Sequence, residues 1–168
     1  MAVNLSYKRL TKITLFFSIF VVFAGSMVKV TGSGMGCPDW PKCFGYYIPP
    51  FDEEQLIWKP NFQYFSGEMI FRKGDLLKAK VDFSTGQKFN SENWSIYDVH
   101  DYKIYNPIHT IIEYVNRLVS VLLGFSVVLM IFFSFKTTRY KKNNIFFSFF
   151  ALFLIGLNAW LGKLVVEG

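Results

Sequence analysis

Charged side chains are scarce in this sequence, and so are cysteines. Asp, Glu, Lys and Arg make up 18% of the 168 residues, whereas hydrophobic residues make up 52% and aromatic residues 20%. This balance excludes an ordinary soluble domain and indicates a membrane protein. The chain has only two cysteines, and a protein that relays electrons between thiols usually needs a second redox pair. No internal repeat and no low-complexity tract is visible in the sequence.

Three stretches are apolar and long enough to cross a bilayer, which takes roughly 20 residues. They are residues 11–30, 108–135 and 145–166. Each is predicted to be an α-helix, because lipid cannot satisfy open backbone groups. The first stretch has a signal peptide as its alternative, but it is longer than a signal core of roughly 7 to 15 residues and no Ala-x-Ala-like cleavage site follows it. We therefore expect an all-α integral membrane protein with a long outer loop.

Acidic residues are absent from the N-terminal tail, residues 1–10, and from the loop of residues 136–144. The basic residues in and beside these segments are Lys8, Arg9, Lys12, Lys136, Arg139, Lys141 and Lys142. Basic loops stay on the cytoplasmic side, so both segments are predicted to be cytoplasmic. The long loop, residues 31–107, mixes acids and bases and is predicted to be periplasmic, with the chain in a bacterial inner membrane. The net charge of +6 then reflects topology, and nucleic-acid binding has little support.

A run rich in glycine and proline follows the first apolar stretch and contains both cysteines. Cys37 and Cys43 bracket a Pro-Asp-Trp-Pro turn within residues 32–45. An oxidising periplasm favours a disulfide between them, and two unpaired thiols are the alternative. A disulfide here would be either a staple or a redox couple, and so short a loop gains only modest closure entropy.

The second apolar stretch begins with a polar stripe. A helix places His109, Glu113, Asn116 and Ser120 along one face. Ionisable groups at membrane depth usually line a cavity, which makes Glu113 and Arg117 functional candidates, although an i,i+4 pair between them is the alternative. His109 has three interpretations: a ligand of heme iron, a partner of Glu113, or a residue at the headgroup level.

Lys29 closes the first apolar stretch and either reaches the headgroups or binds an anionic group. The rest of the long loop alternates aromatic and charged residues. These aromatic residues suit the headgroup level, and a folded hydrophilic cap without chemistry is the alternative. His100 in this loop is interpreted as a solvated residue. The sequence stops at residues 167–168, where the third apolar stretch should emerge, so we expect a fragment.

Three segments resemble successive signatures of the heme A synthase family. They are residues 25–41, which read GSMVKVTGSGMGCPDWP, residues 113–117, which read EYVNR, and residues 159–166, which read AWLGKLVV. Their order and their expected topology also agree with this family, and the first segment is the most specific. The resemblance covers most of the chain outside the aromatic part of the long loop.

The resemblance implies an integral membrane oxidase that converts the C8 methyl group of heme O to the formyl group of heme A for cytochrome oxidase assembly. It implies heme b as cofactor, heme O as substrate and heme O synthase as a possible partner. The family fold has eight helices in two four-helix halves, of which this chain would hold the first three helices. The remainder of such a protein would be needed to close the heme cavity, so this piece alone is expected to be inactive.

The resemblance also assigns roles to single residues. Cys37 and Cys43 match paired cysteines thought to act in electron transfer or in shaping the site. Glu113 matches the essential glutamate of the second helix, a candidate proton acceptor or carbocation stabiliser. Arg117 matches an arginine that could hold a heme propionate. Lys29 is a further candidate for such an anionic group.

The sequence departs from the family motif at Asn116, where the family usually has a histidine that ligates heme iron. Asparagine is a poor heme ligand, so either another histidine holds the iron or this half binds heme with an open coordination site, with Asn116 still among the heme-binding candidates. His109 could replace it only with a heme nearer the surface, because it lies about 10 Å farther out along the helix axis at about 1.5 Å per residue.

Two other functions stay open at this point. One is a membrane thiol oxidoreductase that passes electrons between the outer cysteines and a quinone. The other is a non-enzymatic heme-binding assembly subunit, which would not need Glu113.

Overall fold

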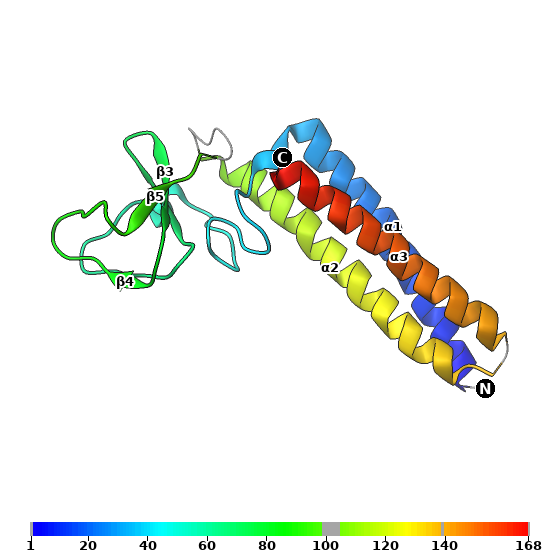
Figure 1. The fold of residues 1–168 in the computed structure, drawn as a ribbon. Helices are drawn as coiled ribbons and strands as arrows, with labels where there is room; N and C mark the ends of the chain where they lie inside the picture. The colour runs from blue at the N-terminus through cyan, green and yellow to red at the C-terminus, as the bar shows by residue number, and fades with distance from the viewer. Residues whose placement is uncertain (1, 99–104, 139, 168) are drawn as a thin grey trace. The chain divides into compact units, whose positions relative to one another are not determined.

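The computed structural model describes residues 2–98, 105–138 and 140–167, so His100 and Gly168 lie outside the described residues. The described part has three long helices, α1 (Ala2–Thr31), α2 (Pro107–Lys136) and α3 (Lys141–Glu167) (Figure 1). It forms two compact units: a helical unit of residues 1–30 and 115–166, and an outer unit of residues 31–114.

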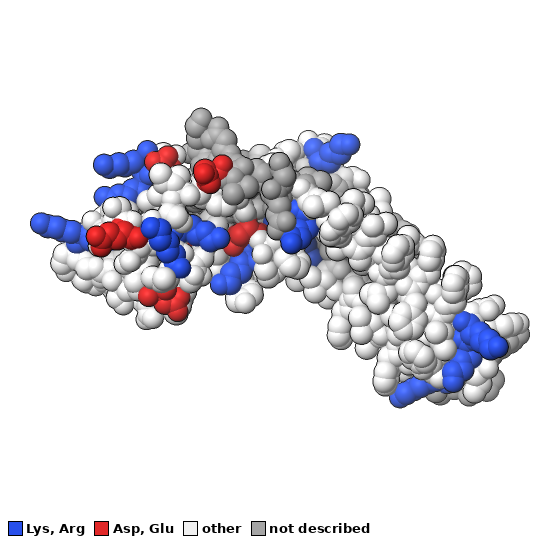
Figure 2. All heavy atoms as spheres, viewed as in Figure 1, with Lys and Arg blue, Asp and Glu red and all other residues white. Residues whose placement is uncertain are grey.

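The three helices are long and apolar enough to cross a membrane, over Leu5–Thr31, Pro107–Lys136 and Lys141–Leu164. The apolar stretches noted in the sequence lie inside α1, α2 and α3. On the visible face of the helical unit in Figure 2, lysine and arginine side chains lie near its ends, and the surface between them is almost free of charge. The chain is therefore a multi-pass membrane protein.

Side-chain hydroxyl groups join the three helices of the helical unit. The hydroxyl of Thr14 on α1 donates to the hydroxyl of Ser126 on α2 over 3.1 Å, and both residues are buried. The hydroxyl of Tyr7 on α1 lies 3.1 Å from that of Ser148 on α3. Small hydroxyl residues let helix backbones approach closely in lipid, where apolar side chains gain little from leaving the solvent.

The outer unit contains short strands that the sequence analysis did not predict. They are β1 (Gln63–Tyr64), β2 (Met69–Arg72), β3 (Asp75–Ala79), β4 (Phe83–Ser84) and β5 (Trp94–Ile96), with short 3-10 turns at Ser33–Met35 and Glu53–Leu56. In the described part, β3 pairs antiparallel with both β2 and β5, and β1 pairs antiparallel with β4. The all-α class expected from the sequence therefore describes the membrane helices, whereas the outer unit contains β-structure.

Many aromatic residues of the long loop form the core of the outer unit. Tyr64 and Trp94 are buried, and their rings lie 5.0 Å apart in an edge-to-face contact. The residues packed with them are Ile70, Ala79, Trp58, Leu77, Phe83 and Phe89. For these residues the structure favours the folded cap over a position at the headgroup level, because their rings fill a protein core.

A second cluster contains the two cysteines and connects them to the sheet. Its buried members are Cys37, Cys43, Phe44, Leu56, Met69, Leu76 and Tyr105. The ring of Phe44 contacts the rings of Phe71 and Tyr105, at 6.2 and 5.6 Å between centroids. This packing fixes the cysteine loop against both β2 and the segment that leads into α2.

Candidate functional site

The first turn of α2 is fixed by a side-chain cap. The side-chain oxygen of Asn106 accepts hydrogen bonds from the backbone N–H groups of Ile108 and His109, at 3.0 and 3.3 Å. Pro107 occupies the first helical position, where its missing N–H costs nothing. The cap therefore fixes where α2 begins, and with it the positions of the polar residues in its first turns.

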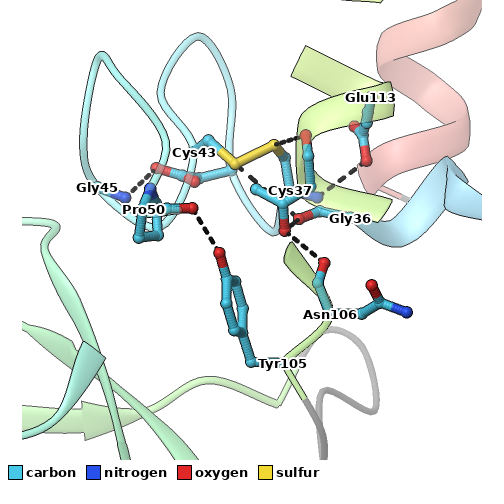
Figure 3. Close-up of a disulfide and its surroundings, with 10 residues drawn as sticks. Gly36, Cys37, Cys43, Gly45, Pro50, Tyr105, Asn106 and Glu113 are labelled. Atoms are coloured by element: carbon cyan, nitrogen blue, oxygen red, sulfur yellow. Dashed lines mark hydrogen bonds between the residues drawn. A yellow bond between two sulfur atoms is a disulfide. The ribbon is translucent and has the colours of Figure 1, made fainter. Parts of the chain in front are cut away.

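Cys37 and Cys43 form a disulfide, with their Cα atoms 4.8 Å apart (Figure 3). The expected pairing is confirmed, and the alternative of two unpaired thiols is wrong because the structure contains no free cysteine. Cys37 is 0% exposed and Cys43 is 1% exposed. Attack by an external thiolate requires access to a sulfur atom, so this burial protects the bond.

A tight turn over residues 43–46 closes the disulfide loop. The backbone N–H of Cys43 donates to the carbonyl of Tyr46 over 2.8 Å, and the N–H of Tyr46 donates back over 3.1 Å. Phe44 and Gly45 at its centre have φ angles of 56° and 85°. A Cβ on Gly45 would lie 2.3 Å from the carbonyl oxygen of Gly67, so only glycine fits this position.

The disulfide loop lies directly against the first turns of α2. A Cβ on Gly36 would lie 2.4 Å from the carbonyl oxygen of His109. The hydroxyl of Thr110, which is 1% exposed, donates to the carbonyl of Gly36 over 2.9 Å. A residue without a side chain is therefore required where the two backbones meet, and a buried hydroxyl holds them together.

The carboxyl group of Glu113 accepts a hydrogen bond from the residue that follows Gly36 in the same loop. The N–H of Cys37 donates to Oε2 of Glu113 over 2.9 Å, and Glu113 is only 4% exposed (Figure 3). A hydrogen bond to an ionised acceptor is stronger than one between neutral groups. The carboxyl group is thus held at a fixed position beside the disulfide, where it can accept a proton or face a developing positive charge.

Two tyrosines tie the cysteine segment to the rest of the outer unit. The hydroxyl of Tyr97 donates to the carbonyl of Pro38 over 2.7 Å, and the hydroxyl of Tyr105 donates to the carbonyl of Pro50. Burial raises the pKa of both phenols, with Asp39 adding to the effect at Tyr97. Both therefore stay protonated and continue to donate at neutral pH.

The structure brings together Cys37, Cys43 and Glu113, all within the outer unit. His109 belongs to the same unit and is half-buried, and its carbonyl rather than its imidazole faces Gly36. Among the described residues, no group of three or more His, Cys, Asp or Glu side chains could hold a metal ion.

The other predicted site residues belong to the helical unit. Asn116 and Arg117 are half-buried on α2, and Lys29 is exposed in the last turn of α1. The side-chain oxygen of Asn116 lies 3.8 Å from the position that a Cβ on Gly25 would occupy. Asn116 therefore faces a position of α1 that carries no side chain.

Comparison with known protein families shows to which family the chain belongs. The family model described as "Cytochrome oxidase assembly protein" matches residues 8–168, which is nearly the whole chain. The chain belongs to this family. The curated relatives that it matches are named heme A synthase, so the recognition based on the three sequence segments is confirmed.

These heme A synthases are similar to limited parts of the chain. The protein of Shewanella oneidensis is 38% identical over 47 residues, which are 28% of this chain and 14% of that protein. The protein of Bacillus licheniformis is 41% identical over 61 residues, 35% of this chain and 20% of that protein. The protein of Geobacillus kaustophilus is 40% identical over 50 residues, 29% of this chain and 16% of that protein. The aligned segments thus span a fifth or less of these relatives, and no solved structure matches the chain.

For this member of the cytochrome oxidase assembly family, sequence reasoning missed the residues that hold the site together. Thr110 is the clearest case, because it lies 74 positions from Gly36 along the chain. Its spacing of three residues from Glu113 places both on one helix face, which was a usable signal. Gly36 belongs to the glycine-rich family segment, but its contact with α2 could not be predicted from that segment. Tyr105 had no local signal, since its role depends on a contact with a distant segment.

Proposed function

We propose that this protein acts as a heme A synthase, which oxidises the C8 methyl group of heme O to the formyl group of heme A for cytochrome oxidase assembly. Membership of the family supports the reaction class. The observation that supports a catalytic site in this chain is the buried carboxyl group of Glu113, held by the N–H of Cys37 at 2.9 Å. Conversion of a methyl to a formyl group is an oxidation that adds one oxygen atom, so it requires a source of oxygen and an acceptor for the electrons.

Glu113 is the proposed catalytic residue. A carboxylate with a fixed position can accept a proton from the reacting carbon or stabilise positive charge that develops there. Because Cys37 donates from its backbone, the hydrogen bond depends on the fold of the loop rather than on a mobile side chain. The disulfide, Gly36 and Thr110 act in this proposal as positioning groups for that donor.

Arg117 and Lys29 are proposed to bind the propionate groups of heme O. Both carry cationic side chains on membrane-spanning helices, and a guanidinium group can contact a carboxylate through two hydrogen bonds. Heme O is the proposed substrate, and heme O synthase is its proposed source in the same membrane.

A resident heme b does not fit the residue at position 116. Asn116 supplies a carboxamide, whereas heme iron is held by His, Cys, Met or Tyr side chains. Asn116 Oδ1 lies opposite Gly25, and His109 is the only histidine in the described part of the chain. Both cysteines are bound in the disulfide. Asn116 and the two cysteines therefore supply no axial ligand, and no step of the proposed reaction is assigned to a resident heme.

The burial of the cysteines argues against a thiol oxidoreductase. Disulfide exchange needs a sulfur atom that a partner can reach. Cys37 and Cys43 are almost inaccessible, and the chain has no further cysteine to relay electrons. An assembly subunit that only binds heme stays an outcome of the test below, because it would not require the carboxyl group of Glu113.

The test is a heme extraction profile from cells that make heme O, with the full-length gene for this chain present or deleted. We expect deletion to remove heme A and to cause heme O to accumulate, and the restored gene to reverse both changes. An unchanged profile would mean that the family signatures mark a shared scaffold, and the heme-binding assembly function would replace the synthase.

A further inference from the structure

One short segment of the outer unit exposes large apolar side chains, in contrast to the buried aromatic residues of the sheet. Within residues 40–51, the exposed fractions are 66% for Trp40, 73% for Tyr47, 68% for Ile48 and 57% for Phe51. Single exposed apolar residues are ordinary on a protein surface, but four within twelve positions form a local concentration.

The turn over residues 43–46 separates Trp40 and Tyr47 from the buried cluster. It buries Phe44 against the rings of Phe71 and Tyr105. Trp40 and Tyr47 flank this turn and are left outside the cluster. The ammonium group of Lys42 lies 5.0 Å from the ring centre of Tyr47, so a cation accompanies the exposed aromatic residues.

The segment is held at the end of a membrane-spanning helix. The outer unit includes the first turns of α2, and the candidate span begins at Pro107. Gly36 contacts the backbone of His109, and Cys37 binds Glu113. The disulfide loop therefore lies where α2 begins its span, which is the depth of lipid headgroups.

We propose that residues 40–51 form a membrane anchor that inserts Trp40, Tyr47, Ile48 and Phe51 into the headgroup region of the bilayer that α2 crosses. The partner is phospholipid. Trp and Tyr concentrate at this level because each combines an apolar ring with a polar edge, and a nearby lysine can extend to the phosphates. This inference does not depend on the proposed catalytic activity.

Charge defines where the anchor ends. Asp52, Glu53 and Glu54 follow Phe51 directly and are all exposed. Carboxylates are costly in the apolar region, so the chain returns to water at this point. The anchor therefore contains one cation, Lys42, and is followed by three acids. Because these charges oppose each other, insertion should depend little on anionic lipid.

The four tryptophans of the chain make the proposal testable by fluorescence. Trp58 and Trp94 are packed in the aromatic core, and Trp160 lies on α3. The full-length protein is placed in phosphatidylcholine nanodiscs, with or without bromine on the upper acyl chain. Quenching by brominated lipid and by aqueous iodide is measured for the parent, Trp40→Phe and Trp160→Phe.

We expect Trp40→Phe to remove a component that brominated lipid quenches and iodide does not reach, and Trp160→Phe to retain that component. Serine at both Tyr47 and Ile48 should reduce the lipid quenching of Trp40 at least twofold. Phe65→Ser is the matched control, since Phe65 is 50% exposed in the sheet region, and it should leave this quenching unchanged. Loss of an iodide-quenched component in Trp40→Phe would overturn the proposal, and so would a Trp40 signal that neither quencher reaches, because a protein surface would then cover the segment.

Discussion

The backbone N–H of Cys37 donates to the carboxyl group of Glu113 over 2.9 Å, although the two residues are 76 positions apart. One belongs to a disulfide loop and the other to a membrane-spanning helix. Glu113 is only 4% exposed, and burying a carboxylate without a hydrogen-bond donor is costly. The loop thus supplies a hydrogen-bond donor that offsets the cost of burying the Glu113 carboxyl group. Changes in the loop should therefore alter the position of this carboxyl group.

Gly36→Ala should separate the loop from α2. The added Cβ would meet the carbonyl oxygen of His109 at 2.4 Å, and backbone atoms cannot move aside as a flexible side chain can. We expect a destabilisation of the outer unit of about 1–3 kcal/mol, measured by thermal unfolding and by the rate of limited proteolysis. Gly86→Ala is the control, because a Cβ on Gly86 meets no atom within 4 Å. Equal stability of both variants would contradict the close contact.

Thr110→Val should weaken the contact between the disulfide loop and α2, because valine has nearly the shape of threonine but no hydroxyl group. Valine lacks the hydroxyl that donates to the carbonyl of Gly36 over 2.9 Å. A lost buried hydrogen bond costs about 1–2 kcal/mol, and heme A production by the full-length protein should fall in parallel. Thr110→Ser retains the hydroxyl and should restore most of the production. A valine variant with parent stability and parent heme A would show that this hydrogen bond has no role.

The two cysteines should resist labelling in membranes. Because Cys37 and Cys43 are buried and paired, a thiol reagent should label neither without reductant, and efficient labelling should need both reductant and denaturant. Serine at both positions should lower the stability of the outer unit by about 2 kcal/mol, from the closure entropy of a loop with a separation of 6 residues. Labelling of native protein without reductant would contradict the disulfide.

Glu68 should make the outer unit more stable in mild acid. Burial raises its pKa above the ordinary value of 4.5, opposed by the N–H of Phe65 and by Lys42, and reinforced by Asp82. A carboxyl group with a raised pKa in the folded state favours folding when protonated, so this contribution is full below 4.5 and is lost as pH rises through the folded value.

Glu68→Gln removes that titration. We expect the Tm of the parent to rise relative to that of the Gln variant as pH falls from about 7 to about 4. The comparison uses thermal unfolding of both proteins in the same detergent. A constant difference across this range would show that Glu68 titrates at its ordinary pKa in the folded unit.

The membrane helices could be predicted from the sequence because their length and apolar composition are properties of continuous segments. The sheet of the outer unit could not be predicted in the same way, since alternating aromatic and charged residues fit both the headgroup level and a folded cap. A local signal existed at Lys73 and Gly74, whose φ angles of 53° and 89° form the turn between β2 and β3. A glycine preceded by a polar residue between two apolar runs is a hairpin pattern.

The candidate site was predictable only in part. Cys37, Cys43 and Glu113 were selected by residue type, because paired cysteines outside the membrane and a glutamate inside it both require an explanation. The contact between Cys37 and Glu113 was not predictable, since it depends on the close approach of Gly36 to α2. Long-range backbone contacts leave no periodic pattern in the sequence.

The most direct test of the central claim is the heme composition of cells in which the full-length protein carries Glu113→Gln. Glutamine keeps an oxygen that can accept from Cys37, so the fold should be retained while the charge and the basicity are lost. Glu68→Gln is the matched control, because Glu68 is also buried and belongs to the same unit. We predict that Glu113→Gln lowers heme A by about 100-fold or more, with heme O accumulating, at an unchanged protein level, and that Glu68→Gln does not. Undiminished heme A in Glu113→Gln cells would contradict the catalytic role of Glu113.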